Sequence, residues 1–190
     1  MAAATFIDTA RARPAVMLGV LGLVSGILSA WAGMTYEPAW LSAPGKLFFL
    51  EAGSMPIGIF FAAAMAVGVW LSTGRKAAIP VVLLATMYAW SAAIQTAIVV
   101  MNTSSDPRQI IGSLAAGAVG AGVTHLGCAL VAAELRSTRR IATTVVVGAI
   151  AGLLYYLGDR EIIDLRVLFI VWQPAVAYSI GIGLAARSAA

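Results

Sequence analysis

Charge, histidine and cysteine are scarce in this sequence. Only 11% of its 190 residues are charged, and there is one histidine and one cysteine. Soluble domains carry about 25% charged residues, so the shortage argues against a protein that folds in water. A single cysteine cannot close an internal disulfide, and Cys128 is therefore interpreted as a small apolar residue of the interior.

Several kinds of membrane chemistry require residues that are missing. A retinal Schiff base needs a lysine within a span, whereas both lysines, Lys46 and Lys76, lie near the ends of apolar runs. Haem held by two histidines, an HExxH zinc site and a CxxC thiol site all need more histidine or cysteine than the chain has. We therefore predict no metal and no cofactor, assign no catalytic residue and do not expect an enzyme.

Apolar residues are abundant instead. They make up 61% of the chain, and the mean hydropathy is +0.94. They occur in continuous runs rather than in the alternating segments of about ten residues that build membrane β-barrels. Helices satisfy their own backbone hydrogen bonds, so continuous apolar runs fold as helices in a bilayer. The sequence predicts an all-α integral membrane protein.

Six apolar stretches have about the length that a helix needs to cross a bilayer. Polar turns separate them, for example NTSSDPRQ at 102–109 and RSTRR at 136–140. We predict a compact bundle of six transmembrane helices in a single domain, 15–187, with short tails at 1–14 and 188–190. A five-span protein is the alternative, because the fifth stretch is barely long enough. The predicted spans are about 15–36, 55–73, 78–101, 110–134, 141–158 and 167–186.

The basic residues predict the orientation of the bundle, because cytoplasmic loops retain Lys and Arg. With both termini in the cytoplasm, eight of the 12 Lys and Arg residues face inward and four face outward. They stand at span ends, so the net charge of +4 is interpreted as a topology signal and not as a nucleic-acid surface. A composition rich in Ala, Gly, Val and Arg favours a bacterial protein. We predict a multi-pass position in the inner membrane, with lipid as its partner.

The longest connection, 38–56, has two interpretations. It is an interfacial helix that carries Phe48 and Phe49 in the lipid boundary, or it extends the second span back to Lys46. In the second case Glu51 enters the outer leaflet, where a carboxylate is a candidate for function. In the first case Glu51 is an interfacial acid that faces water or pairs with Lys46.

Small residues at four-residue spacing predict close helix packing. Lipid is as apolar as leucine, so membrane helices associate through close backbone approach rather than through hydrophobic burial. Spans one and five each contain a GxxxG pair, and span four carries a ridge of small residues that makes it the predicted central helix. The residues concerned are Gly22 and Gly26, Gly148 and Gly152, and the ridge of Gly112, Ala116, Gly120 and Thr124.

Polar residues within the spans are the candidates for a site, because they are costly in a bilayer. At about 1.5 Å per residue, His125 lies about 22 Å from the start of span four, past the midplane. Tyr88 and Tyr178 lie at comparable depths in spans three and six. The three side chains meet if these spans are neighbours.

A second polar layer is predicted closer to the outer surface. Gln95 and Gln173 each lie about 9 Å from the outer end of their spans, which suggests an amide pair. Pro174 follows directly and has no N–H group, so it leaves the carbonyl of Ile170 without its helical partner and predicts a kink.

Two functions are consistent with this pattern. The first is a transporter or channel for a small solute or ion, with a polar path that runs from Glu51 through Gln95, Gln173 and the tyrosines to His125. The second is a non-catalytic subunit or scaffold that docks onto a larger membrane complex, or forms a homo-oligomer, through its glycine faces. In the first case the polar residues converge on one wet cavity. In the second they are interhelical hydrogen bonds, and a face of small residues is left exposed.

Overall fold

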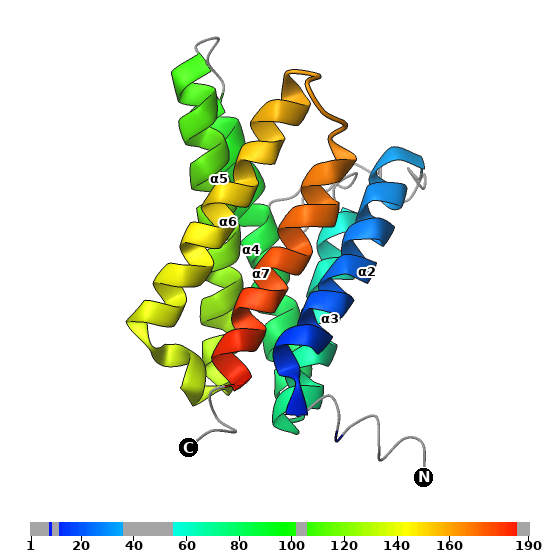
Figure 1. Cartoon of the computed structure of the whole chain (residues 1–190), viewed down its shortest axis with the longest axis vertical. Helices are drawn as coiled ribbons and strands as arrows, with labels where there is room; N and C mark the ends of the chain where they lie inside the picture. Colours follow the sequence, from blue (N-terminus) through cyan, green and yellow to red (C-terminus); the bar gives the residue numbers. More distant parts are fainter. Residues whose placement is uncertain (1–7, 9–11, 36–54, 102–105, 186–190) are drawn as a thin grey trace.

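A computed structural model of the chain describes residues 8, 12–35, 55–101 and 106–185. These residues form six long α-helices and one short 3-10 helix, which run alternately up and down through an elongated bundle (Figure 1). The all-α prediction is confirmed. The elements are α2 (Pro14–Thr35), α3 (Met55–Thr73), α4 (Ala78–Met101), α5 (Asp106–Val131), η2 (Ala133–Arg136), α6 (Thr138–Asp159) and α7 (Arg166–Ala185).

Five of the described helices, α2 and α4 to α7, are long and apolar enough to cross a membrane. The fifth predicted span, an apolar stretch that is barely long enough, forms a helix of 22 residues. The remaining long helix, α3, has a shorter described apolar part, Ile57–Thr73. At about 1.5 Å per residue this part is somewhat shorter than the roughly 30 Å hydrocarbon core. The helices are those of a multi-pass membrane protein, and the sixth crossing stays a prediction.

The helices form a ring. Each packs chiefly against two neighbours, in the order α2, α3, α4, α5, α6, α7 and back to α2. The first and last of them, α2 and α7, lie side by side (Figure 1). The prediction of α5 as the central helix is therefore wrong: it packs between α4 and α6 as one member of the ring. Pairwise close packing of small residues fixes neighbours, but it does not place a helix at the centre.

Both predicted GxxxG pairs pack within the chain. A Cβ atom on Gly22 would lie 2.7 Å from Cα of Pro174, and one on Gly26 would meet the backbone of Phe169 on α7. On the other side of the ring, a Cβ atom on Gly152 would lie 2.5 Å from the Ser113 carbonyl oxygen of α5. These helices approach so closely that only glycine fits. In the described residues the two pairs are therefore not free faces for a partner.

Three helix boundaries differ from the prediction by three or more residues, and the first is the start of α5, at Asp106 instead of at 110. The fourth span ends at Val131 rather than at 134, because Ala133–Arg136 winds as the 3-10 helix η2. The last carbonyls of a helix lack intrahelical donors, and arginine side chains supply them here. Arg75 donates to the Val131 carbonyl and Arg136 donates to that of Ala129 at 3.1 Å. The next helix, α6, then begins at Thr138 instead of at 141.

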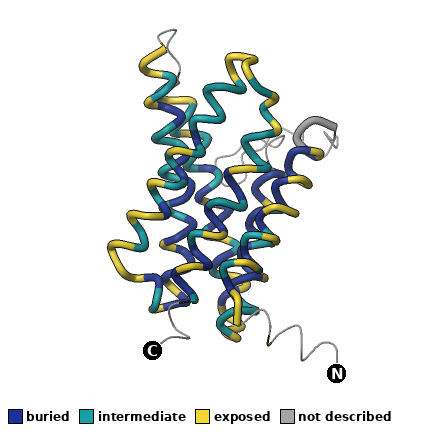
Figure 2. The backbone as a smooth tube through the Cα atoms, viewed as in Figure 1, coloured by how far each residue is buried: buried dark blue, intermediate teal, exposed yellow. Residues whose placement is uncertain are grey.

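The core fills one half of the ring. We call the end of the bundle where α2 begins and α7 ends the terminal end; there, Gly181 packs directly on the backbone of Ala15. Figure 2 shows buried residues inside the bundle and exposed ones along its outside. The outer faces carry large apolar side chains, as expected of helices that face lipid. The largest fully buried apolar side chains lie toward the terminal end and include Leu18, Met65, Val69, Val82, Leu135 and Ile180.

The prediction that Cys128 is an interior residue is confirmed, because its side chain is fully buried. The interpretations of 38–56, with Glu51, and of the tails 1–14 and 188–190 fall largely or wholly outside the described residues. The described helices place the start of α2 and the end of α7 at the same end of the bundle. The cytoplasmic location of that end stays a prediction from the basic residues.

Candidate functional site

His125 is fully buried and ties four elements together. Its Nε2 lies 2.9 Å from the carbonyl oxygen of Leu135 in η2, and its Nδ1 lies 2.8 Å from Oγ1 of Thr144 in α6. The Thr144 hydroxyl lies 2.9 Å from that of Ser179 in α7. A carbonyl only accepts, so Nε2 donates to it, and Nδ1 of a neutral ring is the acceptor that faces the Thr144 hydroxyl, which also lies 3.1 Å from the Arg140 carbonyl oxygen. Both ring nitrogens are used inside the bundle.

Gln173 is also buried, and it joins α7 to α2. Its Oε1 accepts a hydrogen bond from Ser25 Oγ at 2.6 Å, and its Nε2 donates to Ser29 Oγ at 3.0 Å. The predicted partner, Gln95, is exposed on α4. Two serines one helical turn apart therefore satisfy the amide that was expected to pair with Gln95. The next residue, Pro174, lies within the continuous helix α7 at the point where Gly22 packs against it.

The two tyrosines predicted to meet His125 lie on the outside of the bundle. Tyr88 is 53% exposed and Tyr178 is 48% exposed. Tyr178 packs against Gly19 of α2, on a different side of α7 from the ring interior. The structure thus does not bring His125, Gln173, Gln95 and the tyrosines into one wet cavity. The spacing of polar residues gave their depths, but a depth does not determine which face of its helix a residue occupies.

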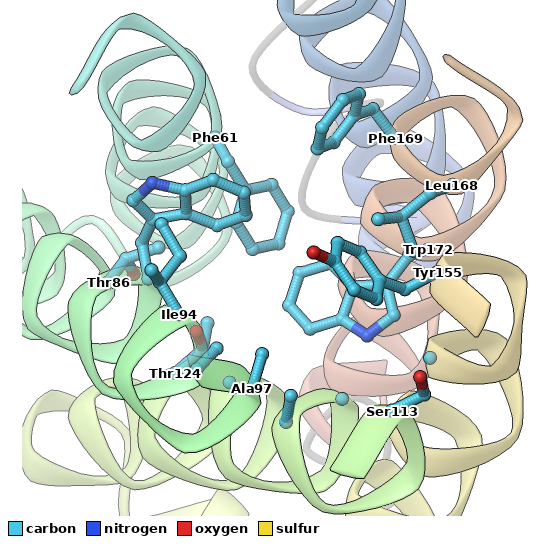
Figure 3. A pocket seen from close by; sticks show the side chains of 16 residues that line it. Phe61, Thr86, Ile94, Ala97, Ser113, Thr124, Tyr155, Leu168, Phe169 and Trp172 are labelled. Carbon is cyan, nitrogen blue, oxygen red and sulfur yellow. The ribbon is translucent and has the colours of Figure 1, made fainter. Parts of the chain in front are cut away.

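The structure instead contains a cavity between the helices that the polar residues did not indicate. It has a volume of about 280 Å³, is partly open, and is lined almost entirely by apolar atoms from α3 to α7 (Figure 3). It extends from the packed core, where Phe61 and Trp172 form part of its wall, toward the end of the ring opposite the terminal end. Its residues are Phe61, Thr86, Trp90, Ala93, Ile94, Ala97, Ser113, Ala116, Gly117, Gly120, Thr124, Gly152, Tyr155, Leu168, Phe169 and Trp172.

Aromatic side chains form one part of the wall and are fixed in place. The indole N–H of Trp172 donates to the Gly148 carbonyl at 3.1 Å, and its ring packs edge-on against Phe61 at a centroid distance of 5.5 Å. The rings of Trp90 and Phe169 lie 6.1 Å apart. Rings held by such contacts need little ordering when a ligand binds, which favours an apolar or aromatic molecule.

Small residues make the space on the opposite wall. The predicted ridge of α5 contributes Ala116, Gly120 and Thr124 to the cavity. The adjacent row, Gly117 and Ala121, packs against Gly148 of α6. Sequence reasoning identified this ridge but assigned it to helix packing. The sequence feature that could have indicated the cavity is the second row of small residues on α5, because packing against one neighbouring helix requires only one such row.

The cavity offers a largely apolar surface for binding. None of the described residues that line it is charged. Among residues 8, 12–35, 55–101 and 106–185, no group of His, Cys, Asp and Glu is arranged to hold a metal ion. Comparisons with protein-family models, with curated proteins and with solved structures find no match for this chain.

Proposed function

We propose that this protein is a membrane carrier whose cargo is a small, neutral and largely apolar molecule. The cargo binds in the cavity that the helices α3 to α7 line. The observation that carries the proposal is an apolar cavity of about 280 Å³. An engineered apolar cavity of about 150 Å³ stays dry and binds benzene. The larger cavity here accommodates a molecule of about two fused rings.

The lining determines the cargo class. A charge in an apolar site is costly unless a partner neutralises it, and the cavity wall offers no charged side chain. The aromatic wall of Phe61, Trp90, Phe169 and Trp172 offers ring faces and edges to a planar occupant. An ion or a strongly polar solute is therefore disfavoured relative to an apolar one. This narrows the transporter hypothesis to apolar cargo.

The alternative of a docking subunit has less support. Its predicted docking faces, Gly22 with Gly26 and Gly148 with Gly152, are covered by α7 and α5 of the same chain. The basic residues favour an orientation with the terminal end in the cytoplasm. In that orientation the cavity extends from the inner half of the bilayer toward the outer leaflet, and its cargo is exchanged with that leaflet.

Saturable binding of radiolabelled naphthalene to the protein in lipid nanodiscs tests the proposal. Protein-free nanodiscs measure the fraction that merely dissolves in lipid. We expect a saturable component of one molecule per chain. Ala97→Phe places a ring in the cavity and is expected to reduce this component at least tenfold. The matched control Ala142→Phe adds the same ring at an exposed position of α6 and leaves binding unchanged.

Two results contradict the proposal. The first is naphthalene uptake that rises linearly with concentration and never exceeds that of protein-free nanodiscs. The second is a saturable component that Ala97→Phe and Ala142→Phe reduce equally, because this would place the binding site at the lipid-facing surface. Retention of the helical circular dichroism spectrum in both variants ensures that the comparison concerns folded protein.

A further inference from the structure

Two hydroxyl groups in the cavity wall have no hydrogen-bond partner. They belong to Thr86 of α4 and Thr124 of α5, which are 1% and 0% exposed. Both side chains line the cavity (Figure 3). A buried polar group without a partner costs free energy, and most such groups in native proteins are satisfied. A pair of them in one cavity therefore needs an explanation.

Other threonines of the chain show the usual solution for a helix. Thr73, Thr96 and Thr143 each donate to the carbonyl oxygen four residues earlier, at 2.7, 2.7 and 2.9 Å. This back-bonding is available to a threonine within a helix without any neighbour. Thr86 and Thr124 do not use it, and their hydroxyls are buried in the cavity wall without a partner.

The two threonines lie at the same level of the bundle. Thr86 is eight residues from the start of α4 and Thr124 is seven from the end of α5, so both lie about 10 to 12 Å from the terminal end of their helices. Close packing of Ala85 against Gly127 holds the two helices together beside them. Ala97 and Ser113 lie farther toward the opposite end. The pair thus marks the deep end of the cavity.

We infer that the cargo carries one neutral oxygen function, a carbonyl or hydroxyl, at one end of its apolar body, and that Thr86 and Thr124 hold this oxygen at the deep end of the cavity. The inference rests on the proposed function, because it specifies the ligand of the same cavity. A carbonyl oxygen accepts from both hydroxyls, while a ligand hydroxyl accepts from one and donates to the other. Either satisfies both threonines at once.

The uncharged wall limits this oxygen to a neutral group. A carboxylate at the same position would be buried without a cation, since none of the described lining residues is Lys or Arg. The aromatic wall contacts the body of the molecule. The complete ligand is therefore an amphiphile with a short polar end, such as a phenol or an aromatic or cyclic ketone.

The test compares naphthalene with 1-naphthol, which differ by one hydroxyl. Saturable binding of each labelled probe is measured in nanodiscs and corrected for its partition into protein-free nanodiscs. We expect the corrected affinity for 1-naphthol to exceed that for naphthalene by about fivefold or more, which corresponds to one or two net hydrogen bonds. The isosteric double variant Thr86→Val, Thr124→Val is expected to abolish this preference, measured as the ratio of the two corrected affinities.

Two further variants complete the design. Thr96→Val removes a hydroxyl that is already bonded within α4 and is expected to leave the preference for 1-naphthol intact. Thr124→Ser keeps the hydroxyl with a smaller side chain and is expected to retain most of the preference. Preservation by serine and loss by valine identifies the hydroxyl as the cause, independently of any change in packing.

The outcomes separate the two proposals. Equal corrected affinities of the two probes for the unaltered protein, or a preference that survives the double valine variant, overturn the inference and leave the apolar carrier intact. Absence of saturable binding for both probes overturns the proposed function and the inference together. A preference that Thr96→Val removes to the same extent also overturns the inference, because the effect would not come from the cavity.

Discussion

Replacement of Gln173 by leucine separates a structural role from a role in ligand binding. The buried amide makes two interhelical hydrogen bonds, to Ser25 and Ser29. Neither serine hydroxyl is left without a partner in Gln173→Leu. Ser25 Oγ lies 2.9 Å from the Gly22 carbonyl oxygen, and Ser29 Oγ lies 3.3 Å from the Ile57 carbonyl oxygen. Leucine is similar in volume, so the loss of packing is small.

The expected magnitude follows from these contacts. Interhelical hydrogen bonds in membrane proteins contribute about 0.6 kcal/mol each on average, so the loss of two lowers the free energy of unfolding by about 1 kcal/mol. Reversible unfolding in mixed micelles with increasing denaturing detergent measures this value. A double-mutant cycle of Gln173→Leu with Ser25→Ala is expected to give a coupling energy of about 0.6 kcal/mol.

The same variant is expected to bind naphthalene and 1-naphthol normally, because Gln173 does not line the cavity. The reasoning is refuted if Gln173→Leu keeps full stability and loses ligand binding, which would place the amide on the ligand path. A coupling energy near zero between Gln173 and Ser25 would equally refute it.

The remaining predictions concern packing, the histidine network and the cavity hydroxyls, and each is measured by the same unfolding assay. Gly148→Ala forces a methyl group against Ala121 and the Gly117 carbonyl and is expected to lower the free energy of unfolding by about 2 kcal/mol. The control Gly122→Ala meets only a methyl of Val145 at 3.2 Å and is expected to lower it by less than about 0.5 kcal/mol. Equal losses of stability would refute the close packing of α5 on α6. His125→Leu removes the donor to the Leu135 carbonyl and is expected to lower the free energy of unfolding by about 1 to 3 kcal/mol, with ligand binding unchanged. A variant that keeps its stability but loses binding would show that His125 contacts the ligand. Thr86→Val removes an unsatisfied hydroxyl and is expected to stabilise the ligand-free protein by about 1 kcal/mol; a loss of stability would indicate that Thr86 has a partner in the folded chain.

The spans and the close-packing glycines were predictable from the sequence, because both depend on local properties. An apolar run of sufficient length becomes a helix in lipid wherever it stands. Glycines four residues apart permit close approach whichever helix packs against them. Thus the positions of α2 and α6, and the use of Gly22 and Gly148 in packing, followed from the residues alone.

The partners of these features were not predictable, because they depend on the order of helices around the ring. His125 bonds to Thr144 only because η2 turns the chain back so that α6 lies beside α5. Gln173 reaches Ser25 and Ser29 because the last helix packs against the first. Depth along a helix can be counted from sequence, but the direction of a side chain around the helix axis could not be assigned without the neighbours.

The cavity was missed for a related reason. Its wall combines the small residues Ala116 and Gly120 of α5 with Trp172 and Phe61 from helices on other sides of the ring. A cavity arises where small residues of one helix face rigid rings that do not fill the space, and this requires knowledge of both walls. The polar residues, which guided the sequence-based hypothesis, are largely used to join helices.

The most direct test of the account is a structure of the protein with 4-bromo-1-naphthol, located by the anomalous scattering of its bromine. The account predicts a single bromine between the aromatic wall and α5, with the naphthol oxygen within hydrogen-bond distance of Thr86 and Thr124. Bromine found only at the lipid-facing surface, with the cavity free of the probe, would contradict it.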